Sequence, residues 1–269
     1  MKATIRDCIY GQAVGDALGV PYEFRTRGTF ECPGMVGHGS HDQPAGTWSD
    51  DTSMALATCD SIRVIGRIDV RDMRGRFVRW YCEDVYTVNG LFDIGGTTAD
   101  ALSARRGRTG ARDNGNGSLM RILPLAFTNA TDDEVRAVSS ITHAHAVSCE
   151  SCVRMVHAAR RLIAGEGAHG VACDLVGTSE GEFRSGGYGA GHRARRPVVL
   201  CQHIGLCRVR ACGRRLGGRY RHHRSGGERV YLYRVRHRRH SGEGCGCPAW
   251  QGRDRVLPLL RLATRLWLR

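Results

Sequence analysis

Long apolar runs are missing from this sequence. No hydrophobic stretch approaches the roughly 18 residues that a membrane-spanning helix needs. The first ten residues carry Lys2, Arg6 and Asp7 and lack the apolar core of a secretory signal peptide. We therefore expect a cytoplasmic protein, in which the 12 cysteines are mostly reduced thiols. A hydrophobic content of 41% in 269 residues still permits a packed core.

Strand patterns are also missing, because alternation of apolar and polar residues does not stand out before residue 188. No internal repeat is present. Apolar residues recur instead at helical spacing, with Met73, Phe77, Trp80 and Tyr81 expected to form one core-facing side. The sequence therefore predicts an all-α fold, with helices over 4–19, 54–63, 69–86, 98–105 and 119–127, one that begins after Thr131, and a long one within 141–163.

Acidic residues are scarce in the last third of the chain. Residues 183–269 contain three acidic residues and 21 Arg, with no Lys, whereas residues 1–182 contain 23 acidic and 19 basic residues. The net charge of +14 is thus an average over two dissimilar parts. An abrupt basic block is typical of a nucleic-acid-binding tail, which is one interpretation of residues 189–269.

The most informative stretch, Gly46–Met54, reads G-T-W-S-D-D-T-S-M. Ser49 fits the N-cap position of a helix, and acids in a first turn suit the helix dipole. Adjacent carboxylates nevertheless repel each other unless solvent or a cation offsets their charge. Ser49, Asp50, Asp51 and Thr52 form an all-oxygen set that suits a hard cation such as Mg²⁺. From these residues alone, a helix cap and a metal site both stay open.

Two further stretches carry polar residues in unusual settings. Glu23 stands between Tyr22 and Phe24, where it is either an ion-paired surface residue or a functional acid. The Gly-rich segment 113–118 runs into the apolar segment 119–127, and such a loop exposes backbone N–H groups to an anion or forms a simple turn.

The remaining His and Cys pairs argue against a metal centre of the zinc type. His143 and His145 are two residues apart, a spacing that does not place both on one helix face. Cys149 and Cys152 form a lone C-x-x-C within a helical pattern, which favours a structural role.

Taken together, these pieces resemble the ADP-ribosylglycohydrolase family, an all-helical group that includes dinitrogenase reductase-activating glycohydrolase. The resemblance covers about residues 3–188. Its motifs stand in the family's order: Gly11-Gln12-Ala13-Val14-Gly15-Asp16-Ala17-Leu18-Gly19 with Glu23, Trp48-Ser49-Asp50-Asp51-Thr52, Asp93-Ile94-Gly95, Asn114-Gly115-Asn116-Gly117-Ser118-Leu119-Met120-Arg121, and Thr142-His143.

The resemblance implies a hydrolase that uses two Mg²⁺ ions to remove ADP-ribose from a modified protein side chain or a small ADP-ribosyl ester. Such a reaction builds oxocarbenium-like charge at the ribose, which divalent cations and nearby carboxylates assist. The implied metal ligands are Ser49, Asp50 and Asp51, and the implied catalytic acids are Glu23 and Asp51. The implied substrate contacts are Asp93, which lines the cleft, the pyrophosphate loop of Gly115, Asn116, Gly117 and Ser118, and His143 near the ADP-ribose. Gly95-Gly96-Thr97 departs from the family's usual Gly-Asn-Thr.

A second metal motif of the family, Gly-Gly-Asp-Thr-Asp-Thr, is absent from the last third. In its place stands Gly217-Gly218-Arg219-Tyr220-Arg221-His222-His223-Arg224. Codons for this run, read from their second base, permit Gly-Gly-Asp-Thr-Asp-Thr-Thr. In the same frame, residues 195–200 permit Ala-Ala-Leu-Trp-Cys-Phe. We therefore infer a frameshift close to Gly189, just after the family-like segment 185–188.

The frameshift inference divides the chain into an incomplete helical domain at 1–188 and an Arg-rich segment at 189–269 that is not a native domain. The domain is truncated in effect after about residue 188, and we expect the printed chain to be impaired or inactive. Two alternatives stay open: a non-catalytic ADP-ribose-binding relic, and a protein with a genuine nucleic-acid-binding tail. The expected partner is an ADP-ribosylated protein or a small ADP-ribosyl substrate, with no membrane.

Overall fold

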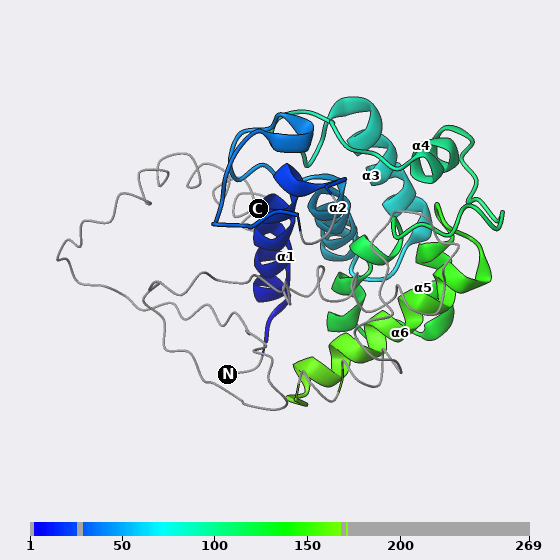
Figure 1. Cartoon of the computed structure of the whole chain (residues 1–269). Coiled ribbons are helices and arrows are strands. Elements are labelled where there is room, and N and C mark those ends of the chain that lie inside the picture. Colours follow the sequence, from blue (N-terminus) through cyan, green and yellow to red (C-terminus); the bar gives the residue numbers. More distant parts are fainter. Residues whose placement is uncertain (1–2, 26–28, 168–170, 172–269) are drawn as a thin grey trace.

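The computed structural model describes residues 3–25, 29–167 and 171 (Figure 1). Residues 189–269, with their inferred frameshift, lie outside the described residues. Within these limits the chain forms no strand, and its regular elements are α-helices and short 3₁₀ (η) turns, so the all-α prediction is confirmed. In order they are α1 (Ile5–Gly19), η1 (Val20–Tyr22), η2 (Gly39–His41), α2 (Asp50–Ile65), α3 (Val70–Glu83), α4 (Gly96–Ser103), η3 (Leu119–Arg121), η4 (Leu123–Phe127), α5 (Asp132–Ser139) and α6 (Ala146–Ile163).

Side-chain caps explain where several helices begin. Thr4 and Asp7 form a capping box at the start of α1, and Thr131 and Glu134 form another at α5, as the sequence predicts for Thr131. Ser49 caps α2, where its Oγ accepts a hydrogen bond from the N–H of Asp51. In the described residues no helix is long and apolar enough to cross a membrane.

The expected helix over 119–127 is wrong: this segment forms η3 and η4 instead. Pro124 has no N–H and could not donate to the carbonyl of Met120, four residues earlier. That carbonyl accepts a hydrogen bond from the Gln12 side chain, at 2.8 Å, in place of a helical one. The interruption of the helix at Pro124 therefore leaves the Met120 carbonyl available to Gln12 of α1.

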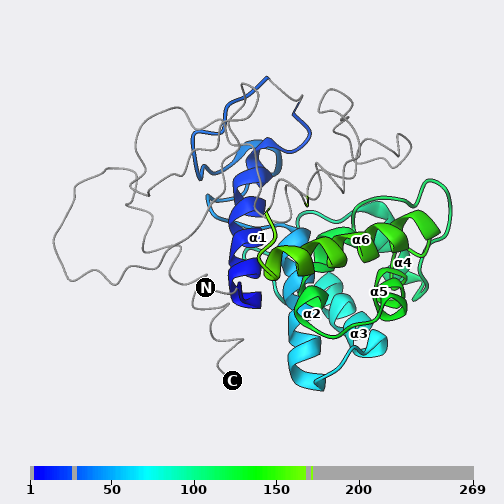
Figure 2. The same cartoon turned by 90° about the horizontal axis from the view of Figure 1, so that it is seen from below.

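Helix α2 lies between α1 and α3, and α5 packs along α6 on another side of the core (Figures 1 and 2). Met54, Ala55 and Ala57 of α2 have no exposed surface. The predicted core residues Met73, Phe77 and Trp80 of α3 are likewise fully buried, whereas Tyr81 is partly buried. The N-terminus of α2 is thus fixed by packing on both sides.

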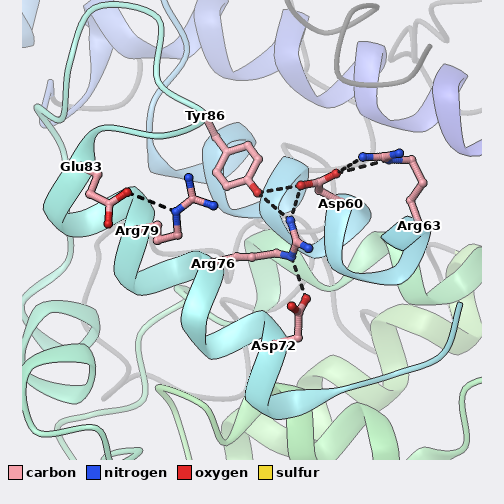
Figure 3. A network of polar contacts seen from close by, with 7 residues as sticks. All are labelled: Asp60, Arg63, Asp72, Arg76, Arg79, Glu83 and Tyr86. Carbon is pink, nitrogen blue, oxygen red and sulfur yellow. Dashed lines mark hydrogen bonds and ion pairs between the residues drawn. The ribbon is translucent and has the colours of Figure 1, made fainter. Parts of the chain in front are cut away.

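A polar network joins α2, α3 and the loop that follows α3 (Figure 3). Arg76 of α3 pairs with Asp60 of α2, donates to Asp72 at 2.7 Å and contacts the Tyr86 hydroxyl at 3.2 Å. The Tyr86 hydroxyl also donates to Asp60 at 2.9 Å. The carbonyl of Tyr86 accepts from Trp48 Nε1 at 3.1 Å, so this network reaches the residue before Ser49.

Candidate active site

The N-terminus of α2 is held by one carboxylate of α1. Asp16 Oδ1 accepts from Ser49 Oγ at 2.8 Å, and its Oδ2 accepts from Thr52 Oγ1 at 2.6 Å and from Thr52 N–H at 3.0 Å. The Ser49 N–H also donates to Asp16, at 3.1 Å. The hydroxyl proton of Ser49 is therefore directed to Asp16, which leaves the lone pairs of Oγ as its acceptor face.

Carboxylates from four segments gather around this point. Burial raises the pKa of Asp50 well above its usual range, and Asp93, Asp16 and Glu23 raise it further. Burial, followed by the charge of Asp50, also raises the pKa of Asp51 well above its usual range. Because the neighbouring carboxylates oppose ionisation of Asp50 and Asp51, this point favours a counter-charge.

Glu23 lies in the same cluster and ionises near neutrality. Burial and the charge of Asp93 raise the pKa of its carboxyl to about 7, while a hydrogen bond from His41 opposes the rise. One ligand atom each from Glu23, His41 and Asp93 lies within 4.8 Å of the others. His41 lies between the first two helices that the sequence predicts and is not among the candidate site residues, so this contact is a finding of the structure.

The Gly-rich loop lies beside His143. A Cβ on Gly115 would stand 3.5 Å from His143 Nε2, and a Cβ on Gly117 would stand 2.6 Å from His143 Cε1 and 2.8 Å from Thr98 Oγ1. Gly117 is thus needed for close approach to the imidazole. Burial, and then the charge of Arg121, lower the pKa of His143 to about 3, so the ring is neutral at neutral pH.

Ser118 has a different setting from the rest of that loop. Its Oγ is buried and contacts Ser139 Oγ at 3.0 Å and Cys152 Sγ at 3.4 Å. These contacts direct the side chain of Ser118 into the core, so its hydroxyl is engaged there. Asn116, by contrast, is exposed.

Two side chains connect the Gly-rich loop to the acids. Gln12 Nε2 donates to the carbonyls of Asp51, at 2.9 Å, and Met120, at 2.8 Å. Arg121 is fully buried, donates to the carbonyl of Gly117 at 2.6 Å and lies over the Phe77 ring at 4.7 Å. Burial lowers the pKa of Arg121 to about 10, so it is a cation at neutral pH that interacts with Asp50.

The structure therefore brings Ser49, Asp50, Asp51, Glu23 and Asp93 together and places Gly115, Gly117 and His143 against one another. The sequence reasoning missed roles for Gln12, Asp16, His41 and Arg121. The family motifs contain three of these residues, Gln12, Asp16 and Arg121, so membership in a motif was the signal that could have identified them. His145, predicted not to pair with His143, caps α6 by accepting from the N–H of Val147 at 3.2 Å.

The residues around Ser49 suit a hard cation. Ser49 Oγ, Asp50 and Asp51 offer oxygen atoms only, which Mg²⁺ prefers. The raised pKa values of Asp50 and Asp51 come from desolvation and like charge, and a bound cation would oppose both effects. The donor set therefore fits Mg²⁺.

Similarity to known proteins identifies the family of this chain. The model of the ADP-ribosylglycohydrolase family matches residues 1–194. The chain belongs to the ADP-ribosylglycohydrolase family. It is 36% identical over 170 residues to the ADP-ribosylarginine hydrolase Tri1 of Pseudomonas putida (strain GB-1), covering 58% of this chain and 46% of that protein. It is 34% identical over 173 residues to the ADP-ribosyl-[dinitrogen reductase] glycohydrolase of Rhodospirillum rubrum, covering 58% and 57%.

A solved structure of this family is similar as well. An "ADP-ribosylglycohydrolase-related protein complex" matches with a TM-score of 0.56 and 28% identity, over 74% of this chain and 79% of that chain. The chain spans about half the length of the curated relatives named above.

Proposed function

We propose that this protein is a Mg²⁺-dependent hydrolase that releases ADP-ribose from ADP-ribosylated arginine side chains. The family supports the hydrolysis of an ADP-ribosyl bond, and the name of the Tri1 relative supports arginine as the linkage. The observation that carries the proposal is the gathering of Glu23, Asp50, Asp51 and Asp93 in one coupled cluster next to a Gly-rich loop.

In this proposal the chain's own residues divide the work. Glu23, with a pKa of about 7, populates both protonation states near neutral pH and so can donate or accept a proton at the ribose. Asp93, which lines the cleft, would stabilise positive charge that develops at the ribose carbon. Ser49, Asp50 and Asp51 would hold Mg²⁺, and the bound ion would supply positive charge to orient the ribose hydroxyls and a water molecule and to offset the acids.

The Gly-rich loop would take the substrate's pyrophosphate. Among the backbone–backbone hydrogen bonds outside the helices of the described residues, none has its donor between Gly115 and Ser118, and in this proposal these N–H groups contact the anion. Arg121 holds the carbonyl of Gly117 away from that side and contributes a buried positive charge. His143, neutral at neutral pH, lies against the loop and would contact the ADP-ribose.

We propose further that residues 189–269 are encoded out of frame and that the printed chain is therefore impaired. Two features of the sequence support this: Arg and His residues stand where the family has its second acid motif, and one alternative reading frame permits that motif. Half of the family's metal ligands would then be missing from the protein as printed. Nucleotide sequencing of codons 185–190 tests this directly, since an intact single frame there would overturn it.

One experiment tests activity and impairment together. The full chain and a frame-restored chain are assayed on ADP-ribosylarginine, ADP-ribosylserine and O-acetyl-ADP-ribose, with Mg²⁺ or with EDTA. We expect Mg²⁺-dependent release of ADP-ribose from arginine by the frame-restored chain and no detectable release by the printed chain. Turnover by the printed chain would overturn impairment. Binding of ADP-ribose without turnover by the frame-restored chain would indicate a non-catalytic relic.

A further inference from the structure

The turn η2 delivers an imidazole to the candidate catalytic acid. His41 Nε2 lies 2.5 Å from Glu23 Oε2. The His41 side chain is 12% exposed and that of Glu23 is 30% exposed, so water competes weakly for this contact. A loop residue 18 positions away in sequence therefore fixes one oxygen of Glu23.

The position of His41 is set by the backbone around it. A Cβ on Gly39, at φ +78°, would stand 2.2 Å from the carbonyl oxygen of Pro21, so η2 packs directly on the backbone of η1. Ser40 Oγ donates to the carbonyl of Glu23, which connects the same turn to the acid's own backbone. These contacts leave η2 little freedom to move relative to Glu23.

The imidazole ring itself is packed by two aromatic side chains. Its centroid is 5.5 Å from that of Phe24 and 5.3 Å from that of Phe92, both in tilted arrangements. Phe92 immediately precedes Asp93, so this ring contact connects His41 to the segment that carries Asp93. Packing, and not only the hydrogen bond, therefore orients His41.

The geometry favours a hydrogen-bonded pair over a metal shared by Glu23 and His41. Two adjacent ligands of one octahedral ion at bond lengths of 2.0–2.1 Å stand about 3 Å apart. The observed 2.5 Å between Nε2 and Oε2 is shorter and suits a charge-assisted hydrogen bond. His41 is therefore a partner of Glu23.

We propose that His41 is a positioning residue for Glu23. Its Nε2–H donates to Oε2 and holds the carboxyl in one orientation, so that Oε1 faces the ribose. This role rests on the proposed function, because it assigns Glu23 to the reacting sugar. A misplaced catalytic group costs up to about 100-fold in rate, so loss of the donor affects turnover more than binding.

The first test reads the hydrogen bond in the full chain as it exists, without requiring activity. Ring-nitrogen NMR of ¹⁵N-histidine protein is recorded, and the His41 signals are identified by their loss in His41→Gln. We expect Glu23→Gln to shift the His41 signals and Asp42→Asn to leave them in place. His38, whose Nδ1 lies 2.6 Å from Asp42 on the same loop, provides the reverse control. His41 signals that are unchanged in Glu23→Gln would overturn the proposal.

The second test is kinetic and uses the full chain and the frame-restored chain side by side on ADP-ribosylarginine. We expect His41→Leu to lower kcat about 10- to 100-fold while KM changes less than about threefold. His41→Gln, whose amide nitrogen replaces Nε2, should recover most of the loss, and the control His38→Gln should match the parent. A His41→Leu variant that matches His38→Gln would overturn the proposal. If neither parent chain turns over substrate, the proposed function fails and the NMR result alone decides the role of His41.

Discussion

Replacement of Asp16 by alanine tests how the N-terminus of α2 is held. The carboxylate accepts two N–H groups, from Ser49 and Thr52, and two hydroxyl groups from the same residues. In Asp16→Ala the hydroxyls can rotate to other acceptors, but the two N–H groups lose theirs. A buried donor without an acceptor costs about 1–3 kcal/mol, so two cost about 2–6 kcal/mol.

Part of this cost is offset. Asp16 raises the pKa of Asp50, Asp51 and Glu23 by repulsion, and the variant removes that repulsion together with the desolvation of Asp16 itself. We therefore expect a net loss of about 2–4 kcal/mol in the free energy of unfolding. For a domain of this size, such a loss lowers Tm by about 5–15 °C.

Urea unfolding followed by far-UV circular dichroism measures this loss in the metal-free full chain. Asp69→Ala is the matched control, because Asp69 caps α3 by accepting the N–H groups of Arg71 and Asp72, at 3.0 Å each. Asp69 lies away from the acidic cluster, and loss of an ordinary N-cap costs about 1 kcal/mol. A loss in Asp16→Ala no larger than in Asp69→Ala would refute the reasoning that Asp16 does more than cap a helix.

Three further predictions follow from the site. Gly117→Ala should weaken ADP-ribose binding at least tenfold by calorimetry, because its Cβ would stand 2.6 Å from His143 Cε1. Gly115→Ala should bind ADP-ribose normally, because its Cβ would stand 3.5 Å from His143 Nε2, which is an ordinary contact. The second prediction concerns the free energy of unfolding of the parent minus that of Glu23→Gln, measured by urea titration in EDTA. This difference should fall as pH rises from 5 to 8, because the fold raises the pKa of Glu23 to about 7 and so favours its protonated form. A difference that does not change with pH would contradict this. In the frame-restored chain, Asp50→Asn should lower the rate of ADP-ribose release about 100-fold or more by loss of a charged metal ligand, and a rate like the parent's would favour the helix-cap interpretation of Asp50.

Helix starts that depend on neighbouring residues could be predicted from the sequence. A prediction failed where a contact between residues far apart in the sequence determines the local structure. Ser49 and Thr131 were recognised as caps because a cap depends on residues two or three positions away. Residues 119–127 were predicted as one helix although they contain Pro124. Apolar spacing alone gave no sign that the Met120 carbonyl would find a partner on α1. The prediction followed periodicity, and the proline and the long-range hydrogen bond overrode it.

The candidate site also divides into residues that the sequence could identify and residues that only the folded structure reveals. Glu23, Asp50, Asp51 and Asp93 were recognisable as residue types suited to the chemistry, and the family motifs gave their order. The role of His41 was not recognisable, because it arises from the packing of η2 on η1 through Gly39 and from two aromatic neighbours. The inward setting of Ser118 is likewise a product of α6, which supplies Cys152, and of α5, which supplies Ser139.

Helix α1 sets the geometry of the whole candidate site. Gln12 and Asp16 are four residues apart and so lie on one face of α1. Gln12 contacts the carbonyls of Asp51 and Met120, while Asp16 holds Ser49 and Thr52. One helical turn therefore fixes the distance between the acids of α2 and the start of η3. All of these contacts join residues that the structure describes, and they involve none of the residues that form the second acid motif in the family. The loss of the second acid motif should accordingly weaken metal binding and turnover before it disturbs the arrangement of the first.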